Sequence, residues 1–182
     1  MERPKYLQFF NRVSVLILLL LILIPVSACG QFSARILKVD SLQNQLVVNV
    51  PDNGSPIIKQ MNYPIFKLRE ADIDNSGKNA FILGVIKRTK FDTTHCKRIN
   101  IWKVENNAIV PLWLGSKMSH PLYDFELKKD NAVQTICTIE NEKDGLYLIA
   151  QYKWHSFGLK FIRYIKREIT LDIAYHTLQN EL

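Results

Sequence analysis

Side chains that could bind a ligand gather most densely in a basic cluster near the middle of the chain. The cluster consists of Lys87, Arg88, Lys90, Lys97 and Arg98. Positive side chains that share one surface attract the anionic groups of lipids, glycans or acidic proteins. Because side chains alternate between the two faces of a strand, Lys87 is expected on one face and Arg88 and Lys90 on the other, unless the loop folds back. The cluster is either an anion-binding patch or a solvated surface.

Aromatic residues offer a second kind of binding chemistry, since their rings can stack on sugars. The candidates are Trp102, Trp113, Trp154, Tyr123 and Phe157. In strands, however, large aromatic side chains also supply much of the packing between sheets. The sequence leaves both interpretations open.

Catalytic motifs are absent from the sequence. It contains no Gly-x-Ser-x-Gly, phosphate-loop, Gly-x-Gly-x-x-Gly or His-Glu-x-x-His motif. Ser119-His120 precedes Pro121 in an expected turn, and the four histidines lack metal-ligand spacing: His95, His120, His155 and His176. A triad can assemble from distant residues. The sequence nevertheless predicts a binding protein rather than a hydrolase or another enzyme.

Residues 1–28 have the parts of an export signal. A basic start is followed by the unbroken aliphatic run 15–24 and then by the small residues Ser27 and Ala28. The run is short for a membrane-spanning helix, which needs roughly 20 apolar residues. We therefore expect a signal helix that is cleaved after Ala28.

Cys29 directly follows Val26-Ser27-Ala28, and this arrangement resembles the lipobox of bacterial lipoproteins. The resemblance implies cleavage before Cys29 and attachment of acyl chains such as palmitate to its thiol and new amine. Two or more chains anchor a protein stably, at about 0.8 kcal/mol per buried methylene. Gly30, in place of Asp, implies sorting to the outer membrane, facing the periplasm. An uncleaved anchor and plain secretion are the alternatives.

The charge of the chain is mildly basic. It has 24 Lys and Arg against 17 Asp and Glu, a formal charge of +7, and loss of the leader's three basic residues and one acidic residue leaves +5. This excess permits anionic lipid or glycan neighbours but also occurs in soluble domains. Nucleic acid is not an expected partner in the envelope. We expect a lipidated tether over residues 29–34 and one β-repeat domain over 35–182.

Cys96 and Cys137 are the other two cysteines. An exported protein permits a disulfide between them. Cys137 lies within the apolar run 135–139, so a buried free thiol is the alternative.

Apolar residues along the rest of the chain alternate with period two and are bounded by turn residues. The expected strands are residues 36–39, 45–50, 81–86, 99–104, 108–113, 135–139, 147–152 and 159–165, and the expected turns are 52–54, 75–77, 105–107 and 143–145. This pattern predicts an antiparallel meander. The tail is ambiguous, because Ile169, Leu171 and Ile173 alternate like a strand while residues 174–182 are compatible with a short helix.

A weak internal repeat divides the meander. Residues 64–68 open one unit and residues 121–127 open another about sixty residues later. Each unit ends in an aromatic hairpin, over 102–113 in the first and 152–161 in the second. Units of several strands are typical of propeller blades.

Residues 71–82 resemble the Asp-x-Asp-x-Asp-Gly loop that leads into a strand in FG-GAP/VCBS-type repeats, the blades of integrin-like propellers. Residues 66–113 look like a group of Bacteroidetes-type lipoproteins of unknown function that carry such repeats, with the likeness in segments 84–92, 97–98 and 111–116. The resemblance covers roughly residues 62–161.

In such loops, oxygen ligands at alternating positions enclose calcium, which takes six to eight oxygens. The resemblance implies Asp72, Asp74 and Ser76 as ligands here, although Ala80 stands where a closing acid is expected. In the second unit, residues 128–131 replace the loop. The alternative is that Asp and Asn shape a turn through hydrogen bonds to the backbone.

The sequence as a whole predicts an all-β, propeller-blade-like antiparallel meander, either a partial propeller or a sandwich-like stack. Two complete units and a partial one cannot close a propeller of at least four blades. An unpaired strand edge would then invite a partner. We therefore expect a membrane-anchored, non-catalytic binding or assembly module with an envelope protein partner. The alternative is a protein that binds glycans or peptidoglycan fragments.

Overall fold

The computed structural model describes residues 32–38, 43–51, 54–90, 92–115, 117–130 and 133–182, which belong to the compact unit Gln31–Leu182. The expected signal peptide and Cys29 lie outside the described residues, so their roles stay predictions. Asp52, Asn53 and Asn131, in two expected loops, also lie outside them.

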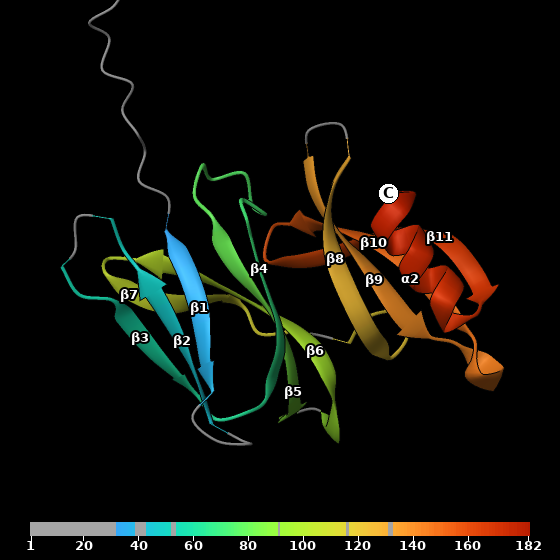
Figure 1. The fold of residues 1–182 in the computed structure, drawn as a ribbon, viewed down its shortest axis with the longest axis horizontal. Helices are drawn as coiled ribbons and strands as arrows, with labels where there is room; N and C mark the ends of the chain where they lie inside the picture. The colour runs from blue at the N-terminus through green and yellow to red at the C-terminus, as the bar shows by residue number, and fades with distance from the viewer. Residues whose placement is uncertain (1–31, 39–42, 52–53, 91, 116, 131–132) are drawn as a thin grey trace, which may run out of the picture. The chain divides into compact units, whose positions relative to one another are not determined.

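The described chain forms three antiparallel sheets, each a meander of successive strands (Figure 1). The first sheet contains β1 (Ser33–Lys38), β2 (Asn44–Asn49) and β3 (Ile57–Met61). The second contains β4 (Ile65–Ala71), β5 (Ala80–Thr89), β6 (Asp92–Glu105) and β7 (Ala108–Trp113). The third contains β8 (Leu122–Asp130), β9 (Val133–Asn141), β10 (Tyr147–His155) and β11 (Gly158–Ile169). A 3-10 turn, η1 (Lys143–Gly145), joins β9 to β10, and helix α2 (Leu171–Asn180) follows β11. The all-β antiparallel expectation is confirmed.

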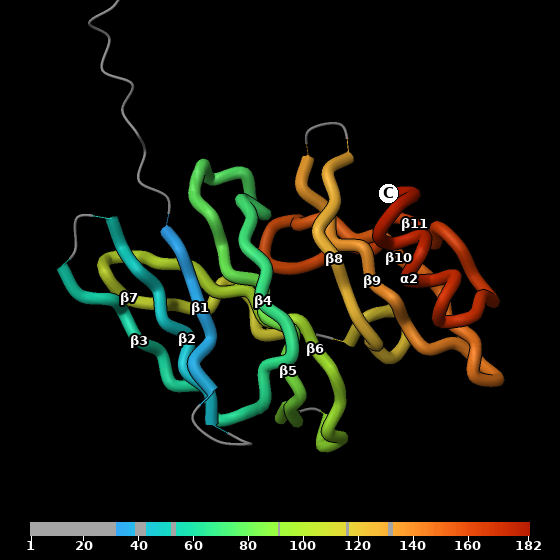
Figure 2. Tube along the Cα trace, viewed as in Figure 1, coloured from blue at the N-terminus to red at the C-terminus, as the bar shows by residue number. Residues whose placement is uncertain are grey.

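The chain completes each sheet before it starts the next, as the colour gradient in Figure 2 shows. The second and third sheets have the same order of strands, and their first strands begin in the same way. The Pro64 carbonyl accepts a hydrogen bond from Ile86 N over 3.0 Å, and the Pro121 carbonyl accepts one from Asn141 N over 2.8 Å. The two sheets are therefore structurally equivalent units, which is consistent with either a sandwich-like stack or a partial propeller.

The second sheet is buried on both faces, which explains the nearly continuous apolar sequence of β5. Phe81, Leu83 and Val85 pack against Leu46 and Met61 of the first sheet, in one apolar cluster. The alternate residues of β5 face the third sheet. In a strand that is covered on one face only, apolar residues would alternate with polar ones instead.

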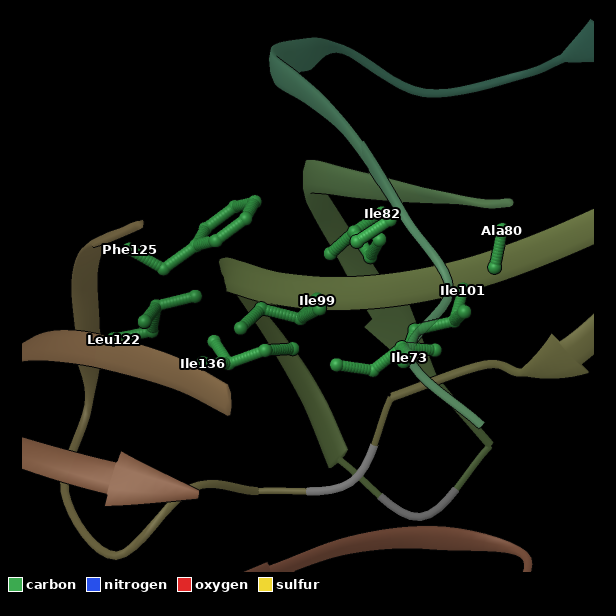
Figure 3. Close-up of a cluster of buried hydrophobic side chains, with 9 residues drawn as sticks. Ile73, Ala80, Ile82, Ile99, Ile101, Leu122, Phe125 and Ile136 are labelled. Carbon is green, nitrogen blue, oxygen red and sulfur yellow. The ribbon is translucent and has the colours of Figure 1, made fainter. Parts of the chain in front are cut away.

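The interface between the second and third sheets is closed by a second apolar cluster (Figure 3). Ile82, Ile99 and Ile101 of the second sheet point toward Phe125 and Ile136 of the third. All five side chains are fully buried. This cluster therefore holds the two repeat units face to face.

Ion pairs link the first strands of these two units beside the apolar cluster. Lys67 Nζ on β4 lies 2.6 Å from Asp124 Oδ1 on β8, and Arg69 pairs with Glu126. Burial by itself would raise the pKa of Glu126, but hydrogen bonds from Arg69 and the charge of Lys67 outweigh it and lower that pKa. The charged edge thus complements the apolar centre of the interface.

Helix α2 covers the other face of the third sheet (Figure 1), where Ala174 and Leu178 pack against Cys137 and Ile149. The Thr170 hydroxyl caps the helix by accepting a hydrogen bond from Ile173 N. The cap explains why the helix begins at Leu171, so the strand-like alternation through Leu171 and Ile173 was misleading.

Several boundaries differ from the sequence expectations. β3, β4 and β8 were not among the expected strands, and β1 begins at Ser33, inside the expected tether. The expected turns over residues 75–77, 105–107 and 143–145 are confirmed, since each contains residues with positive φ: Asn75, Gly77, Asn106, Asn107, Asp144 and Gly145. Cys96 and Cys137 are free thiols, and burial raises the pKa of Cys137 to about 11.

Candidate functional site

A basic groove of about 700 Å³ lies where the end of β5, the buried part of β6 and the segment after β7 meet. Five positive residues line it together with one carboxylate, and they are Lys87, Arg88, Lys90, Arg98, Lys117 and Asp92. Four of the five residues in the predicted basic cluster therefore meet here. Lys117 was not part of the predicted cluster.

An irregularity at the end of β5 brings these side chains together. The register between β5 and β6 shifts between Lys87 and Thr89. Bulges of this kind bend a strand and redirect its side chains. Lys87 and Arg88, which simple alternation would separate, consequently line the same groove.

Arg98 forms the base of the groove and is only 3% exposed. Its Nη2 donates to Asp92 Oδ2 over 2.6 Å, and its Nε donates to the Lys87 carbonyl over 3.2 Å. The hydrogen bond from Arg98, followed by the one from Thr94 N, lowers the pKa of Asp92. Arg98 therefore ties the β5–β6 hairpin together as well as adding positive charge.

Lys87 is half-buried beside Arg98. Its Nζ lies 5.1 Å from the centre of the Tyr63 ring, a cation–π contact. It donates to the Asn100 side-chain oxygen over 3.0 Å in the amide orientation that satisfies all neighbours of Asn100. Burial and then the charge of Arg98 lower the pKa of Lys87. Its positive charge is thus held in place by an aromatic ring and an amide oxygen.

Gly115 allows the segment after β7 to lie against β6. Its φ is +78°, and a Cβ at this position would come within 2.5 Å of the Ile99 carbonyl oxygen. In the same amide orientation, Asn100 donates to the neighbouring Leu114 carbonyl over 2.9 Å. Only glycine fits both the backbone conformation and the close approach. Gly115 was not among the functional residues predicted from the sequence, although a Gly after a strand is a turn signal.

Lys97 does not belong to the groove. It lies on the opposite face of β6, where its Nζ donates to the Tyr123 carbonyl over 2.7 Å and sits 4.3 Å from the centre of the Tyr123 ring. Phe66 provides a second ring at 5.1 Å. Lys97 therefore links the second sheet to the third, while also lining a smaller hollow of about 360 Å³ next to the groove.

A buried carboxylate forms a separate polar network that the sequence analysis did not identify. Glu140 is 0% exposed and accepts four hydrogen bonds, from Ser119 Oγ, His120 N, Thr138 Oγ1 and Tyr152 OH, over 2.6, 2.7, 2.6 and 2.8 Å. Tyr152 OH also accepts from Ser119 N over 3.0 Å. Burial raises the pKa of Tyr152. The network fastens the segment before β8 to the third sheet.

Asp72 and Asp74 of the expected calcium loop make contacts that shape a turn. Asp72 accepts hydrogen bonds from Ser76 N and Gly77 N, each over 2.8 Å. Asp74 Oδ2 lies 3.4 Å from Lys103 Nζ. These contacts favour the turn-shaping alternative. Calcium binding stays a prediction, and melting in millimolar calcium would test it.

Most of the aromatic candidates pack inside the protein. Trp102 is buried, Trp113 and Trp154 pack against the cluster between the second and third sheets, and Tyr123 contacts the rings of Tyr147 and Tyr175. Phe157, at the tip of the β10–β11 hairpin, is 87% exposed. Packing is thus the main role of these residues.

Within the described ranges, no three His, Cys, Asp or Glu side chains gather in a way that could hold a metal ion. The described part of the chain also has no helix with the length and apolar character to span a membrane. In comparisons with known proteins, no protein-family model, curated protein or solved structure matches this chain significantly.

Proposed function

We propose that this protein is a lipoprotein of the bacterial cell envelope that acts as a non-catalytic binding or assembly module. The export-type leader and the lipobox-like motif that ends at Cys29 support a lipid anchor. On this proposal, the β domain extends into the periplasm from the outer membrane. The two equivalent four-stranded units support a relationship to Bacteroidetes-type lipoproteins with degenerate FG-GAP/VCBS-like repeats.

The composition of the basic groove is the observation that carries the binding role. Five positive residues line it and, among the described lining residues, Asp92 is the one carboxylate. Like charges that are held together repel one another unless an anion lies between them. The groove therefore suits an anionic group on an envelope partner.

The anchor is tested by changing Cys29→Ala in the full chain. We expect this variant to lose acyl labelling and to keep its leader, because the lipoprotein peptidase requires the cysteine. A variant that lost the leader and still remained on the membrane would contradict lipidation.

The binding role is tested by crosslinking in native envelopes, followed by capture of the tagged lipoprotein and mass spectrometry. We expect an anionic partner with the wild type and its loss in an Arg88→Glu/Lys117→Glu variant. A Lys129→Glu/Lys143→Glu variant, with the same charge change at exposed positions outside the groove, serves as the control. Equal capture by all three proteins would contradict docking at the groove.

Glycan binding is the second candidate, and it is favoured by exposed rings on one hairpin. Phe157 is 87% exposed, and Phe161 and Tyr164 of β11 are 40% and 36% exposed with ring centres 4.7 Å apart. Rigid exposed rings can stack on sugar faces. A Phe157→Ser/Phe161→Ser variant should then bind peptidoglycan fragments more weakly, while Arg88→Glu/Lys117→Glu should not.

A further inference from the structure

We propose that the basic groove binds a phosphate group carried by an organic molecule. This inference rests on the proposed binding role of the groove and names the chemistry of its ligand. It follows from the charge balance of the groove, the directions from which its donors come and the apolar residues beside them.

The charge balance favours a ligand with more than one negative charge. Arg98 and Asp92 form an ion pair at 2.6 Å, and Lys117 Nζ lies 4.0 Å from the same Asp92 carboxylate. Asp92 therefore already interacts with two cations, Arg98 and Lys117, while Lys87 and Arg88 add further positive charge to the lining. A carboxylate ligand supplies one negative charge. A phosphate monoester supplies nearly two at neutral pH, since its second pKa is about 6.

The arrangement of the donors fits the same ligand. Lys87 and Arg88 come from the end of β5, Arg98 comes from β6, and Lys117 comes from the segment after β7. Three separate segments of the chain therefore contribute donors to the lining of the groove. A phosphate monoester has three free oxygens that accept charge-assisted hydrogen bonds from several directions, whereas a carboxylate has two in one plane.

Lys87 explains why an anion would be stabilised here more than at an exposed lysine. It is held between Tyr63 and Asn100 beside Arg98, so it is already ordered before a ligand binds. Its partial burial and then its proximity to Arg98 disfavour its charge, which lowers its pKa. An anion in the groove would offset this repulsion, and little side-chain entropy would be lost on binding.

Apolar residues next to the cations indicate an organic phosphate rather than the free ion. Trp113 and Leu114 line the groove, and Leu114 is 46% exposed. Free phosphate would leave this apolar surface uncovered. The monoester headgroup of a lipid such as phosphatidic acid, or a soluble phosphate monoester, would place its organic part there.

The test is calorimetric titration of the full lipidated protein, kept in detergent micelles at fixed ionic strength. The probes are glycerol 3-phosphate, dihexanoyl phosphatidic acid and, as the carboxylate control, succinate. We expect both phosphate esters to bind at least ~10-fold more tightly than succinate, a difference of about 1.4 kcal/mol. We also expect binding to fall at least ~10-fold in an Arg88→Ala/Lys117→Ala variant and to persist in a Lys129→Ala/Lys143→Ala control.

The outcomes separate the ligand class from the proposed function. Tighter binding of the short-chain lipid would identify a lipid headgroup, and tighter binding of glycerol 3-phosphate would identify a soluble ester, and both support the inference. Equal affinity for succinate and the phosphates, or binding that the groove variant retains, would overturn it. The crosslinking experiment tests the proposed function independently, since a partner captured through the groove could carry carboxylates alone.

Discussion

Two buried charges, Arg98 in the groove and Glu140 in the third sheet, differ in how their surroundings satisfy them. Glu140 is fully buried and accepts four hydrogen bonds, so its two oxygens are well supplied with donors. Arg98 is 3% exposed and pairs with one carboxylate, while other cations line the same groove. The surroundings of Glu140 therefore satisfy its hydrogen-bonding groups, whereas the surroundings of Arg98 contain more positive than negative side chains.

This difference separates the structural role of Glu140 from the binding role that we propose for the groove. A buried carboxylate with a complete set of donors fixes the elements that supply those donors. A basic groove with one carboxylate keeps electrostatic free energy available for a ligand. Variants at Glu140 should therefore cost stability, while variants at the exposed cations of the groove should cost binding alone.

The largest effect is expected for Glu140→Leu. The change removes the acceptor of the partly buried His120 N–H and of the buried Tyr152 hydroxyl. Leaving such groups unpaired costs on the order of 3 kcal/mol. Urea denaturation measures the loss. Glu140→Gln is the matched control and should cost less, because its amide oxygen can still accept from His120 N. If Glu140→Leu were as stable as the wild type, the network would not fasten the segment before β8.

Gly115→Ala is expected to cost about 2 kcal/mol, because it combines a positive φ with a clash against backbone. Gly145→Ala provides the comparison, since Gly145 has φ +76° but nothing within 4 Å of its Cβ position. Thermal unfolding of both variants should show the larger loss for Gly115. Equal losses would mean that only the backbone strain of a positive φ matters at both sites. The backbone around Ile99 would then move enough to accept the added Cβ at residue 115.

Tyr152→Phe should destabilise the fold by about 1 kcal/mol through loss of one buried hydroxyl group. The same change in the Glu140→Leu background should cost less, since the acceptor is already gone. A double-mutant cycle measures this coupling. Additive effects would indicate that Tyr152 and Glu140 stabilise the protein independently.

The Arg98–Asp92 pair should respond to acid. The pKa of Asp92 in the folded state lies below its ordinary value of 3.8. Its contribution to stability is therefore fully present above pH 3.8 and is lost as pH falls through the lowered value. Asp92→Asn should reduce stability at neutral pH and weaken the pH dependence below pH 4, as followed by urea denaturation. An unchanged acid profile would contradict the role of this pair in the hairpin.

The smallest effect on stability is expected for Arg88→Ala/Lys117→Ala. Removing exposed like charges should change the unfolding free energy by no more than about 0.5 kcal/mol. At low salt, the unfolding free energy of the variant should slightly exceed that of the wild type, because repulsion between cations in the groove decreases. A loss of several kcal/mol would show that these cations are structural, and the contrast with Glu140 would disappear.

Local patterns were enough to predict the antiparallel strands and several turns. The strand expected over residues 108–113 matches β7, and Asn106 and Asn107 have the positive φ that their turn requires. β4 and β8 were missed as strands because charged residues break their apolar alternation. Lys67, Arg69, Asp124 and Glu126 explain this, since they pair with one another between the sheets.

The sequence by itself determined the class of fold, the repeated unit and the concentration of positive charge around Lys87 and Arg98. Those features depend on residues that are close along the chain. Only the tertiary structure decided that Lys97 leaves the groove, that Lys117 and Gly115 join it, and that Glu140 meets Ser119 and Tyr152. The physical reason is that a register shift and the packing of one sheet on another set these contacts, and neither can be inferred from the spacing of residues along one strand.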